Sequence, residues 1–404
     1  MKTVSGGVCA AKGFKAAGIH CGIRKNRTKK DLSLIYSEAP CCAAAVYTQN
    51  LVKGAPLLVT KDHIARGPVR AVICNSGNAN TCNANGVEVA EAMCALAAQR
   101  LNVLPQEVLV ASTGVIGQPL NLDPIREGIA PLVGALSTDG SDDAAEGIMT
   151  TDLKKKQIAV EFEIGGKICH IGGIAKGSGM IHPNMATMLV FITTDAAITG
   201  EMLQKALSTD IQNTFNMISV DGDTSTNDTV TVLANGLAEN PVISEEGEDF
   251  NAFMKALNTV NVYLCRAIAA DGEGATKLLE CSVTGAKDEK AAKIVAKSVI
   301  CSSLFKAAMF GADANWGRVL CAIGYSGAEV DISRVSVSFE SCQGSVCVCQ
   351  NGAGVPFSEE EAKKILLENE ITIAVGLGDG EAAASAWGCD LTYDYVKING
   401  DYRT

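Results

Sequence analysis

No two cysteines in this sequence have C-x-x-C spacing, although the chain contains 16 of them. Histidine is scarce as well, and its four residues lie far apart in the chain: His20, His63, His170 and His182. The close Cys and His spacings that bind zinc are therefore missing, and so is the framework of a small disulfide-rich secreted protein. We expect a cytoplasmic protein without a metal, whose reduced thiols pack as small apolar side chains.

Long apolar runs and an excess of basic charge are also missing. The uncharged run from 177 to 194 is interrupted by His182, Pro183 and Asn184, so no segment is a candidate membrane span. A formal net charge of −11 excludes the basic face that nonspecific nucleic-acid binding needs. The first 30 residues hold eight lysines and arginines, as transit peptides do, but glycines interrupt any amphipathic helix there. We predict an exposed basic strand or loop in that region.

Apolar runs of strand length alternate with helical patterns along the chain. Residues 69–74 read as a buried strand that ends in the Gly/Asn turn 75–78, and residues 108–111 as a second strand that runs into the loop 112–117. A third strand, 187–192, follows a glycine-rich loop. Between the first two strands, apolar residues recur at helical spacing. Such interleaving predicts an α/β or α+β fold with helices covering the sheet faces.

The C-terminal part continues this alternation. Helices are predicted over 244–270 and 288–310, and strands over 371–375 and 391–398. The charged run that begins at Lys287 is the best candidate for a boundary, which gives a C-terminal subdomain over 285–404.

The segment from Lys176 to Leu189 is the most informative for chemistry. It places the hydroxyl of Thr187 at the start of an apolar strand, behind a glycine-rich loop. Attack of this hydroxyl on the Ala186 carbonyl, followed by hydrolysis of the ester, would leave Thr187 with a free α-amine. That amine has a pKa near 8 in model peptides and can serve as the base for its own hydroxyl. From spacing alone, an ordinary threonine at a strand start is the favoured explanation, because β-branched residues are common in strands.

Several further motifs carry a family resemblance. In order along the chain they are Lys12–Gly18, Asn75–Asn80, Ser112–Gly117, Met149–Asp152, Lys176–Leu189, Ser219–Asp228 and Gly311–Arg318. Together they resemble the ornithine acetyltransferase family, also called glutamate N-acetyltransferase, and the resemblance spans essentially all 404 residues.

The resemblance implies specific roles for residues of this chain. The bond between Ala186 and Thr187 is cleaved, and Thr187 is the nucleophile; Thr113 and Gly114 form the oxyanion hole. The residues implied in substrate binding are Thr150, Lys176, Thr187, Glu273, Asn399 and Thr404. From charge alone we assign Lys176 to the carboxylate of N-acetylornithine and Glu273 to its distal ammonium.

The resemblance also implies the architecture and the reaction. The fold is an αββα sandwich related in layout to the N-terminal nucleophile hydrolases, with its own connectivity. Fragments 1–186 and 187–404 stay together and pair into an α2β2 assembly. Acetyl transfer from N-acetylornithine to glutamate is ping-pong through an acetyl-threonine ester, with no metal or cofactor. Some members of the family also take the acetyl group from acetyl-CoA and others do not. No residue of this sequence shows to which of these two kinds of enzyme the chain belongs.

Three alternatives stay open at this stage. A self-processing aminopeptidase of related fold would share the cleavage and release its product to water. An unprocessed binding protein would keep the chain intact. Asp221, Asp223 and Asp228 could suggest a cation site, but the run lacks the glutamate that closes an EF-hand loop. We interpret it as a hydrogen-bonded structural loop near the nucleophile.

Overall fold

The computed structural model of the chain describes residues 1–182 and 188–400. Its larger sheet has the strand order β1-β6-β7-β8-β10-β3-β4-β5, and β2 pairs with β3. The β8–β10 and β4–β5 pairs are parallel, and the other pairs of this sheet are antiparallel. The strands are β1 (Lys2–Val4), β2 (Phe14–Ile19), β3 (Leu32–Tyr47), β4 (Val69–Asn75), β5 (Val108–Ser112), β6 (Lys156–Ile164), β7 (Lys167–Lys176), β8 (Leu189–Thr194) and β10 (Thr229–Ala234).

The long strand β3 joins two halves of this sheet, which pack face to face. Its first part pairs with β2 and β4, whereas Cys42–Tyr47 pair with β10. Between the halves lies a core to which Phe14, Ile35, Val72 and Leu109 contribute from one side and Ile174, Leu189, Phe191 and Leu233 from the other. The inner face of each half is therefore apolar.

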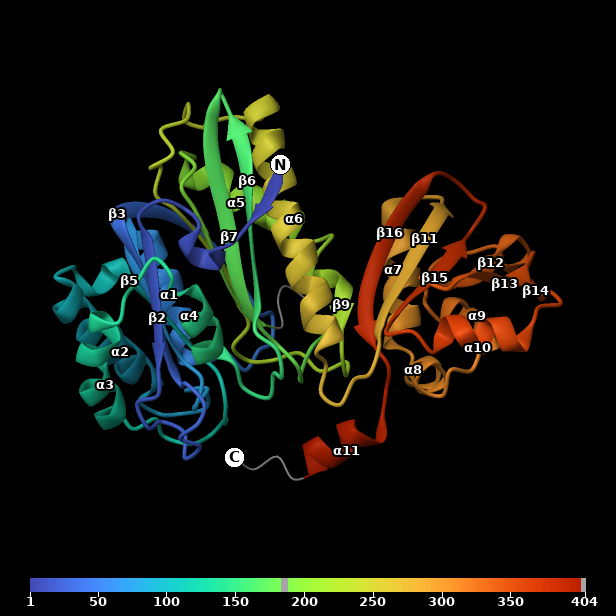
Figure 1. Cartoon of the computed structure of the whole chain (residues 1–404), viewed down its shortest axis with the longest axis horizontal. Helices are drawn as coiled ribbons and strands as arrows, with labels where there is room; N and C mark the ends of the chain where they lie inside the picture. Colours follow the sequence, from blue (N-terminus) through green and yellow to red (C-terminus); the bar gives the residue numbers. More distant parts are fainter. Residues whose placement is uncertain (183–187, 401–404) are drawn as a thin grey trace.

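Helices cover the outer faces of both halves. Helices α1 (Ala55–Arg66), α2 (Gly86–Leu101) and α3 (Asp123–Gly134) pack on the half that contains β2–β5. Helices α5 (Gly200–Asp210) and α6 (Glu248–Ala270) pack on the half that contains β6–β8 and β10, so the layers run helix, sheet, sheet, helix (Figure 1). In β8 this is visible residue by residue, because Leu189 and Phe191 face the inner core while Val190 and Ile192 face α5 and α6. The predicted αββα sandwich is confirmed. The remaining helix of the sandwich, α4 (Ser141–Ile148), lies between the two halves, where Ala144, Ala145 and Ile148 belong to the inner core.

A second sheet follows, with strand order β14-β13-β12-β15-β11-β16-β9. Its strands are β9 (Ile218–Ser219), β11 (Leu278–Ala286), β12 (Ser336–Ser341), β13 (Gly344–Gln350), β14 (Ala353–Gly354), β15 (Glu370–Gly376) and β16 (Ala382–Cys389). Its helices are α7 (Glu289–Cys301), α8 (Ser303–Phe310), α9 (Trp316–Gly324), α10 (Glu359–Leu366) and α11 (Tyr393–Gly400). Figure 1 shows this sheet beside α6, which contacts both sheets. The predicted subdomain start at residue 285 lies within β11, and the division stays a prediction.

Two predicted elements differ from the structure. The strand expected over 391–398 is wrong, because the chain leaves the sheet after β16 and forms α11. Asp390 accepts backbone N–H bonds from Thr276 and Lys277, and the Thr392 hydroxyl donates to the Gly274 carbonyl, which turns the chain away from the sheet edge. The helix expected over 288–310 divides into α7 and α8, since the Ser302 hydroxyl caps α8 by accepting the Phe305 N–H.

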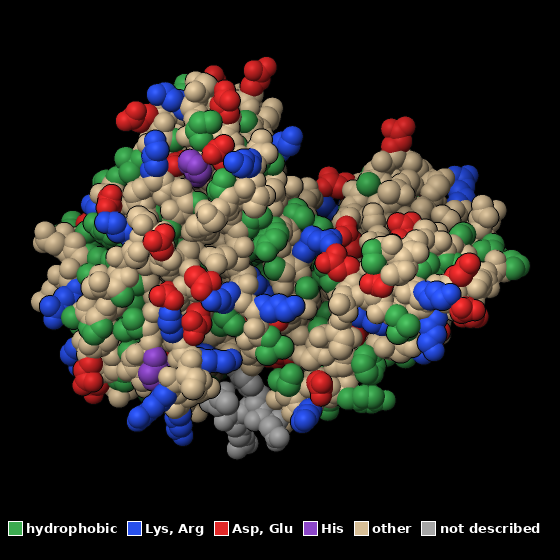
Figure 2. Space-filling view, viewed as in Figure 1, with side chains coloured by type: hydrophobic (Ala, Val, Ile, Leu, Met, Phe, Trp, Pro, Cys, Tyr) green, Lys and Arg blue, Asp and Glu red, His purple; other side chains and the backbone are tan. Residues whose placement is uncertain are grey.

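In the part of the chain that the structure describes, no helix is both long and apolar enough to cross a membrane. On the face drawn in Figure 2, acidic and basic side chains are interspersed. All 16 cysteines lie in the described ranges as free thiols, half of them buried. Burial raises the pKa of thiols such as that of Cys74, to about 12.

Candidate active site

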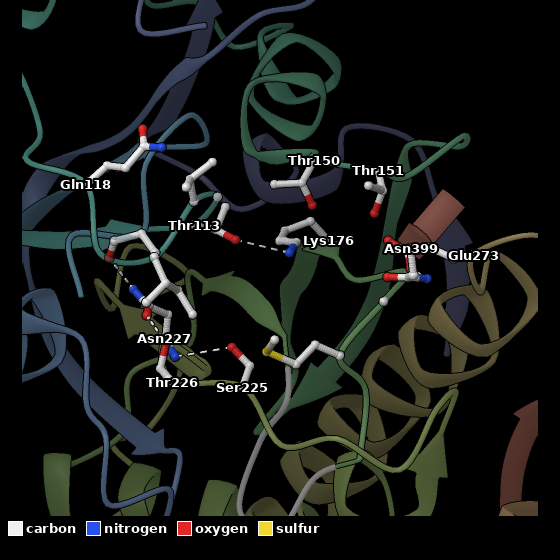
Figure 3. Close-up of a pocket in the computed structure, with 16 residues that line it drawn as sticks. Thr113, Gln118, Thr150, Thr151, Lys176, Ser225, Thr226, Asn227, Glu273 and Asn399 are labelled. Carbon is white, nitrogen blue, oxygen red and sulfur yellow. Dashed lines mark hydrogen bonds between the residues drawn. The ribbon is translucent and has the colours of Figure 1, made fainter. Parts of the chain in front are cut away.

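A cavity of about 590 Å³ opens where β5 and β7 end and the loop after α6 begins. It brings together predicted residues that lie far apart in the sequence: Thr113, Gly114, Thr150, Lys176, Glu273 and Asn399 (Figure 3). The predicted residues Ala186, Thr187 and Thr404 lie outside the described residues. The cavity is also lined by residues to which the sequence assigned no individual role, although all of them except Gln118 lie in the motifs of the family resemblance: Ala79, Val115, Ile116, Gln118, Thr151, Gly179, Met180, Ser225, Thr226 and Asn227.

The Thr113–Gly114 step is held at the end of β5 by a neighbouring loop. The Thr113 N–H donates to the Asn75 carbonyl at 3.0 Å, which continues the pairing of β4 with β5. Gly114 has a φ of 126°, and a Cβ there would lie 2.7 Å from the Gly77 carbonyl carbon. Only glycine fits this left-handed, closely packed position. The motif Asn75–Asn80, which contains Gly77, therefore packs against the motif Ser112–Gly117, which contains Gly114, in the wall of the cavity.

Asn227 fastens the loops that line this side of the cavity. Its side-chain nitrogen donates to the carbonyls of Ala79 and Ser112 at 2.6 and 2.9 Å, and its oxygen accepts the hydroxyl hydrogen of Thr81 at 2.6 Å. Asn227 is buried, so each of these bonds is shielded from water. Asp221, at the start of the same run, accepts the Met180 N–H at 2.6 Å. This hydrogen bond agrees with the interpretation of residues 221–228 as a structural loop.

Lys176 supplies a buried cation at the end of β7. Only 9% of the residue is exposed, and its ammonium donates to the Thr113 hydroxyl oxygen at 3.2 Å (Figure 3). Within residues 1–182 and 188–400 it forms no ion pair with a carboxylate. A buried ammonium without an acidic partner is costly, and an anionic ligand would offset that cost.

Glu273 supplies the opposite charge from the loop after α6. The residue is 8% exposed, and one of its carboxylate oxygens accepts a hydrogen bond from the Asn399 side chain at 2.8 Å. A Cβ on residue 179 would collide with this carboxylate, so Gly179 permits its approach. Among the described residues Glu273 has no cationic partner. The cavity therefore presents to a ligand one cation and one anion that form no ion pair with the described residues.

A buried ion triad holds the segments that carry these groups. Lys156 pairs with Asp152 at 2.7 Å and with Asp271 at 2.6 Å, and all three side chains are almost fully buried. Asp152 also accepts the Gly177 N–H at 2.7 Å and the Thr150 N–H at 2.9 Å. Burial opposes ionisation of Asp152, but the ammonium groups of Lys156 and Lys176 hold its pKa well below the usual range. No local pattern in the sequence indicated that Lys156, Asp152 and Asp271 would meet.

One group of potential metal ligands lies elsewhere, on α1 and α2. Ligand atoms of Asp62, His63 and Glu91 all lie within 4.8 Å of one another. Each of them already has a protein partner, because Asp62 pairs with Arg66 and the ring nitrogens of His63 face Glu91 and the Val108 carbonyl. We therefore interpret the group as a set of side chains that contact other protein groups, with His63 buried and Asp62 and Glu91 nearer the surface.

Comparison with known proteins gives full-length matches. A family model described as the ArgJ family matches residues 15–404. The arginine biosynthesis bifunctional protein ArgJ 1 of Clostridium acetobutylicum is 53% identical over 392 residues, which cover 97% of this chain and 96% of that protein. The ArgJ protein of Caldanaerobacter subterraneus is 50% identical over 405 residues, which cover 100% of each. The crystal structure of the Bacillus halodurans ArgJ protein matches with a TM-score of 0.50 and 49% identity, over 52% of this chain and 98% of that one.

Proposed function

The chain belongs to the ArgJ family, and from that premise we propose that it transfers the acetyl group of N-acetylornithine to glutamate in arginine biosynthesis. The products are ornithine and N-acetylglutamate. One observation carries the assignment to this cavity: the buried charges of Lys176 and Glu273 lack ion-pair partners in the part of the chain that the structure describes. N-acetylornithine carries a carboxylate at one end and an ammonium at the other, so it can neutralise both charges at once.

Thr113 and Gly114 form the oxyanion hole in this proposal. A lysine ammonium can only donate, so the Thr113 oxygen is the acceptor in its bond with Lys176. The Thr113 hydroxyl hydrogen is therefore free to donate to an oxyanion, together with the Gly114 N–H. Donors fixed in this way stabilise a tetrahedral intermediate without reorganisation during the reaction. The close packing of Gly114 on Gly77 fixes the second donor.

Thr187 is the proposed nucleophile, freed when the chain cuts itself after Ala186. Its hydroxyl attacks the acetyl carbonyl of N-acetylornithine, and its α-amine takes the hydroxyl proton and returns it to the departing ornithine nitrogen. Glutamate then attacks the acetyl-threonine ester by the reverse sequence. The solved Bacillus halodurans chain is matched over 98% of its length by 52% of this one, as expected for a fragment of a divided protein.

Assembly, location and donor range extend the proposal. The fragments 1–186 and 187–404 stay associated through the shared larger sheet, to which β7 and β8 contribute from either side of the cut. Two such pairs form an α2β2 heterotetramer in the cytoplasm. N-acetylornithine and glutamate are the principal substrates, and acetyl-CoA is a second donor if this chain shares the bifunctional activity for which its relatives are named.

Mass spectrometry and N-terminal sequencing of the untagged protein test this function together with a transfer assay. We expect two fragments, the larger beginning Thr-Met-Leu-Val, and N-acetylglutamate formed from N-acetylornithine and glutamate. An intact chain of 42.0 kDa would contradict the free-amine mechanism and favour a binding protein. Two fragments that hydrolyse peptides without transferring acetyl would favour an aminopeptidase.

A further inference from the structure

A second, smaller cavity lies directly behind the first. It shares Thr113 and Lys176 with the larger one and is also lined by Met188 and Asp228. Its volume is about 20 Å³, which is enough for one water molecule. Because its lining is polar at Asp228, Lys176 and Thr113, a water there would find hydrogen-bond partners.

Asp228 stands out among the buried aspartates of the described residues. It is 3% exposed, and its Oδ2 atom has no hydrogen-bond partner. The other buried aspartates all accept hydrogen bonds from protein groups: Asp31, Asp152, Asp195, Asp210, Asp271 and Asp390. Burial raises the pKa of Asp228 well above its usual value, although Ser225 and the Lys176 ammonium oppose the shift. A buried carboxyl oxygen without a hydrogen-bond partner beside a functional cavity calls for a chemical explanation.

Strand register places Asp228 beside Met188, the residue that follows Thr187 in the sequence. β8 and β10 are parallel with Thr229 opposite Leu189, and the Thr229 N–H donates to the Met188 carbonyl at 2.8 Å. Asp228 precedes Thr229 just as Met188 precedes Leu189, and both line the small cavity. Met188 is the residue bonded to Thr187.

Self-cleavage has a chemical requirement that acetyl transfer lacks. Before the cut, the nitrogen of Thr187 is an amide and cannot accept the proton of its own hydroxyl. Another group must take that proton and deliver it to the amide nitrogen as the bond breaks. Among the described residues that line the two cavities, the side chains with ionisable groups are Lys176, Glu273 and Asp228. Lys176 donates to Thr113, and Glu273 does not line the small cavity.

We propose that Asp228 carries the proton during self-cleavage, directly or through one water in the small cavity, and that it is dispensable for acetyl transfer afterwards. This inference rests on the proposed cleavage before Thr187. The hydroxyl proton moves to the Asp228 carboxylate as the bond from the Thr187 oxygen to the Ala186 carbonyl carbon forms. The same proton passes to the nitrogen as the C–N bond breaks. Water then hydrolyses the ester, adding its hydroxyl to the Ala186 carbon and its hydrogen to the Thr187 oxygen.

Asp228→Asn tests the proposal, because the amide keeps the shape of the carboxyl but cannot accept and release a proton. Full-length protein is followed on denaturing gels and by intact mass, and acetyl transfer is measured per processed chain. We expect cleavage to slow by about 10²-fold or more, with transfer per processed chain unchanged. Asp210→Asn is the matched control, since Asp210 is buried and also has a raised pKa, but is bonded to Asn258, Asn261 and Thr214 away from both cavities.

A pH series separates proton transfer from a structural role. Cleavage of the unaltered chain should accelerate as the pH rises through the folded-state pKa of Asp228, and the Asp228→Asn chain should lose this dependence. Lys176 is the charged group that faces Asp228 across the cavity; Thr113, Ser225 and Asn227 do not titrate in this range. If Asp228→Asn does not fold, Asp228→Gly is used, and added formate should restore cleavage.

The outcomes distinguish this inference from the function on which it rests. Cleavage of Asp228→Asn or of Asp228→Gly at the normal rate without formate would overturn the role of Asp228 alone. Equal slowing in Asp210→Asn would also overturn it, because the effect would then be one of buried charge in general. Failure of the unaltered chain to cleave would instead contradict the proposed function.

Discussion

Replacing Lys156 by methionine removes the cation that joins two buried carboxylates but keeps a side chain of similar length. The Lys156 ammonium lies 2.7 Å from Asp152 and 2.6 Å from Asp271, and its side chain is 1% exposed. Removing one partner of a buried ion pair leaves uncompensated charge and costs about 3–5 kcal/mol. We expect Lys156→Met to lower the free energy of unfolding by about this amount.

The same substitution should also displace residues of the active site. Asp152 bonds the backbone at Thr150 and Gly177, and Asp271 bonds the backbone at Leu153, so the triad fixes the loops around the cavity. Transfer activity should therefore fall even at temperatures where the variant is folded, since misplacement of a binding group by about 1 Å can cost about 10²-fold in rate.

Denaturant unfolding followed by circular dichroism measures the stability, and the transfer assay measures the activity. Lys155→Met is the matched control: Lys155 pairs with Asp142 at the surface, where an ion pair contributes about 1 kcal/mol or less. Equal destabilisation by the two substitutions would refute the reasoning, because it would show that the buried ion pairs of Lys156 contribute no more to stability than the surface ion pair of Lys155.

Three further predictions concern the cavity and its pH dependence. Gly114→Ala forces a Cβ against Gly77 and should lower kcat by about 10²–10³-fold with the fold retained by circular dichroism; an unchanged kcat would contradict the oxyanion role. Glu273→Gln should raise KM for N-acetylornithine about 10- to 100-fold, as expected from loss of a charge-assisted hydrogen bond worth about 1.5–3 kcal/mol, and an unaltered KM would argue against ammonium binding there. The folded-state pKa of Asp152 is depressed, so its stabilising contribution is present above the unfolded value near 3.9 and is lost as the pH falls below it. Acid titration of Asp152→Asn should show a smaller loss of stability in that window than the unaltered chain, and identical acid profiles would contradict the assignment.

Local pattern was sufficient for the α/β class with helices that cover the sheet faces, whereas the αββα sandwich followed from the family resemblance. A strand such as β8 is apolar on both faces, which indicates layers on either side, and the structure has them. The role of the Thr113–Gly114 step also followed from the resemblance, and the structure adds the steric reason why residue 114 is glycine. The family resemblance supplied the remaining residues of the cavity, which spacing alone does not connect.

Local pattern failed where polar contacts overrode it. The residue pattern over 391–398 predicted a strand. Such a pattern forms a strand only where one face of the segment is buried against other elements, and here none of the residues of α11 is buried. Asp390 and Thr392 bond to the loop that follows α6 and direct the chain into α11. Asn399 on this helix donates a hydrogen bond to Glu273. The element that was wrongly predicted as a strand therefore contributes a residue to the cavity.

The sequence by itself determined the order of strands and turns, the apolar layers and the residue types available for chemistry, because these depend on periodicity and on local backbone preferences. Tertiary structure alone decided which polar groups meet. Asn227 reaches Ala79 and Ser112 across more than a hundred residues, and Lys156 joins Asp271 across a similar separation. It also decided that Asp228 is left without a partner for one oxygen. Such pairings follow from chain folding over long distances, and no local window of sequence contains both members.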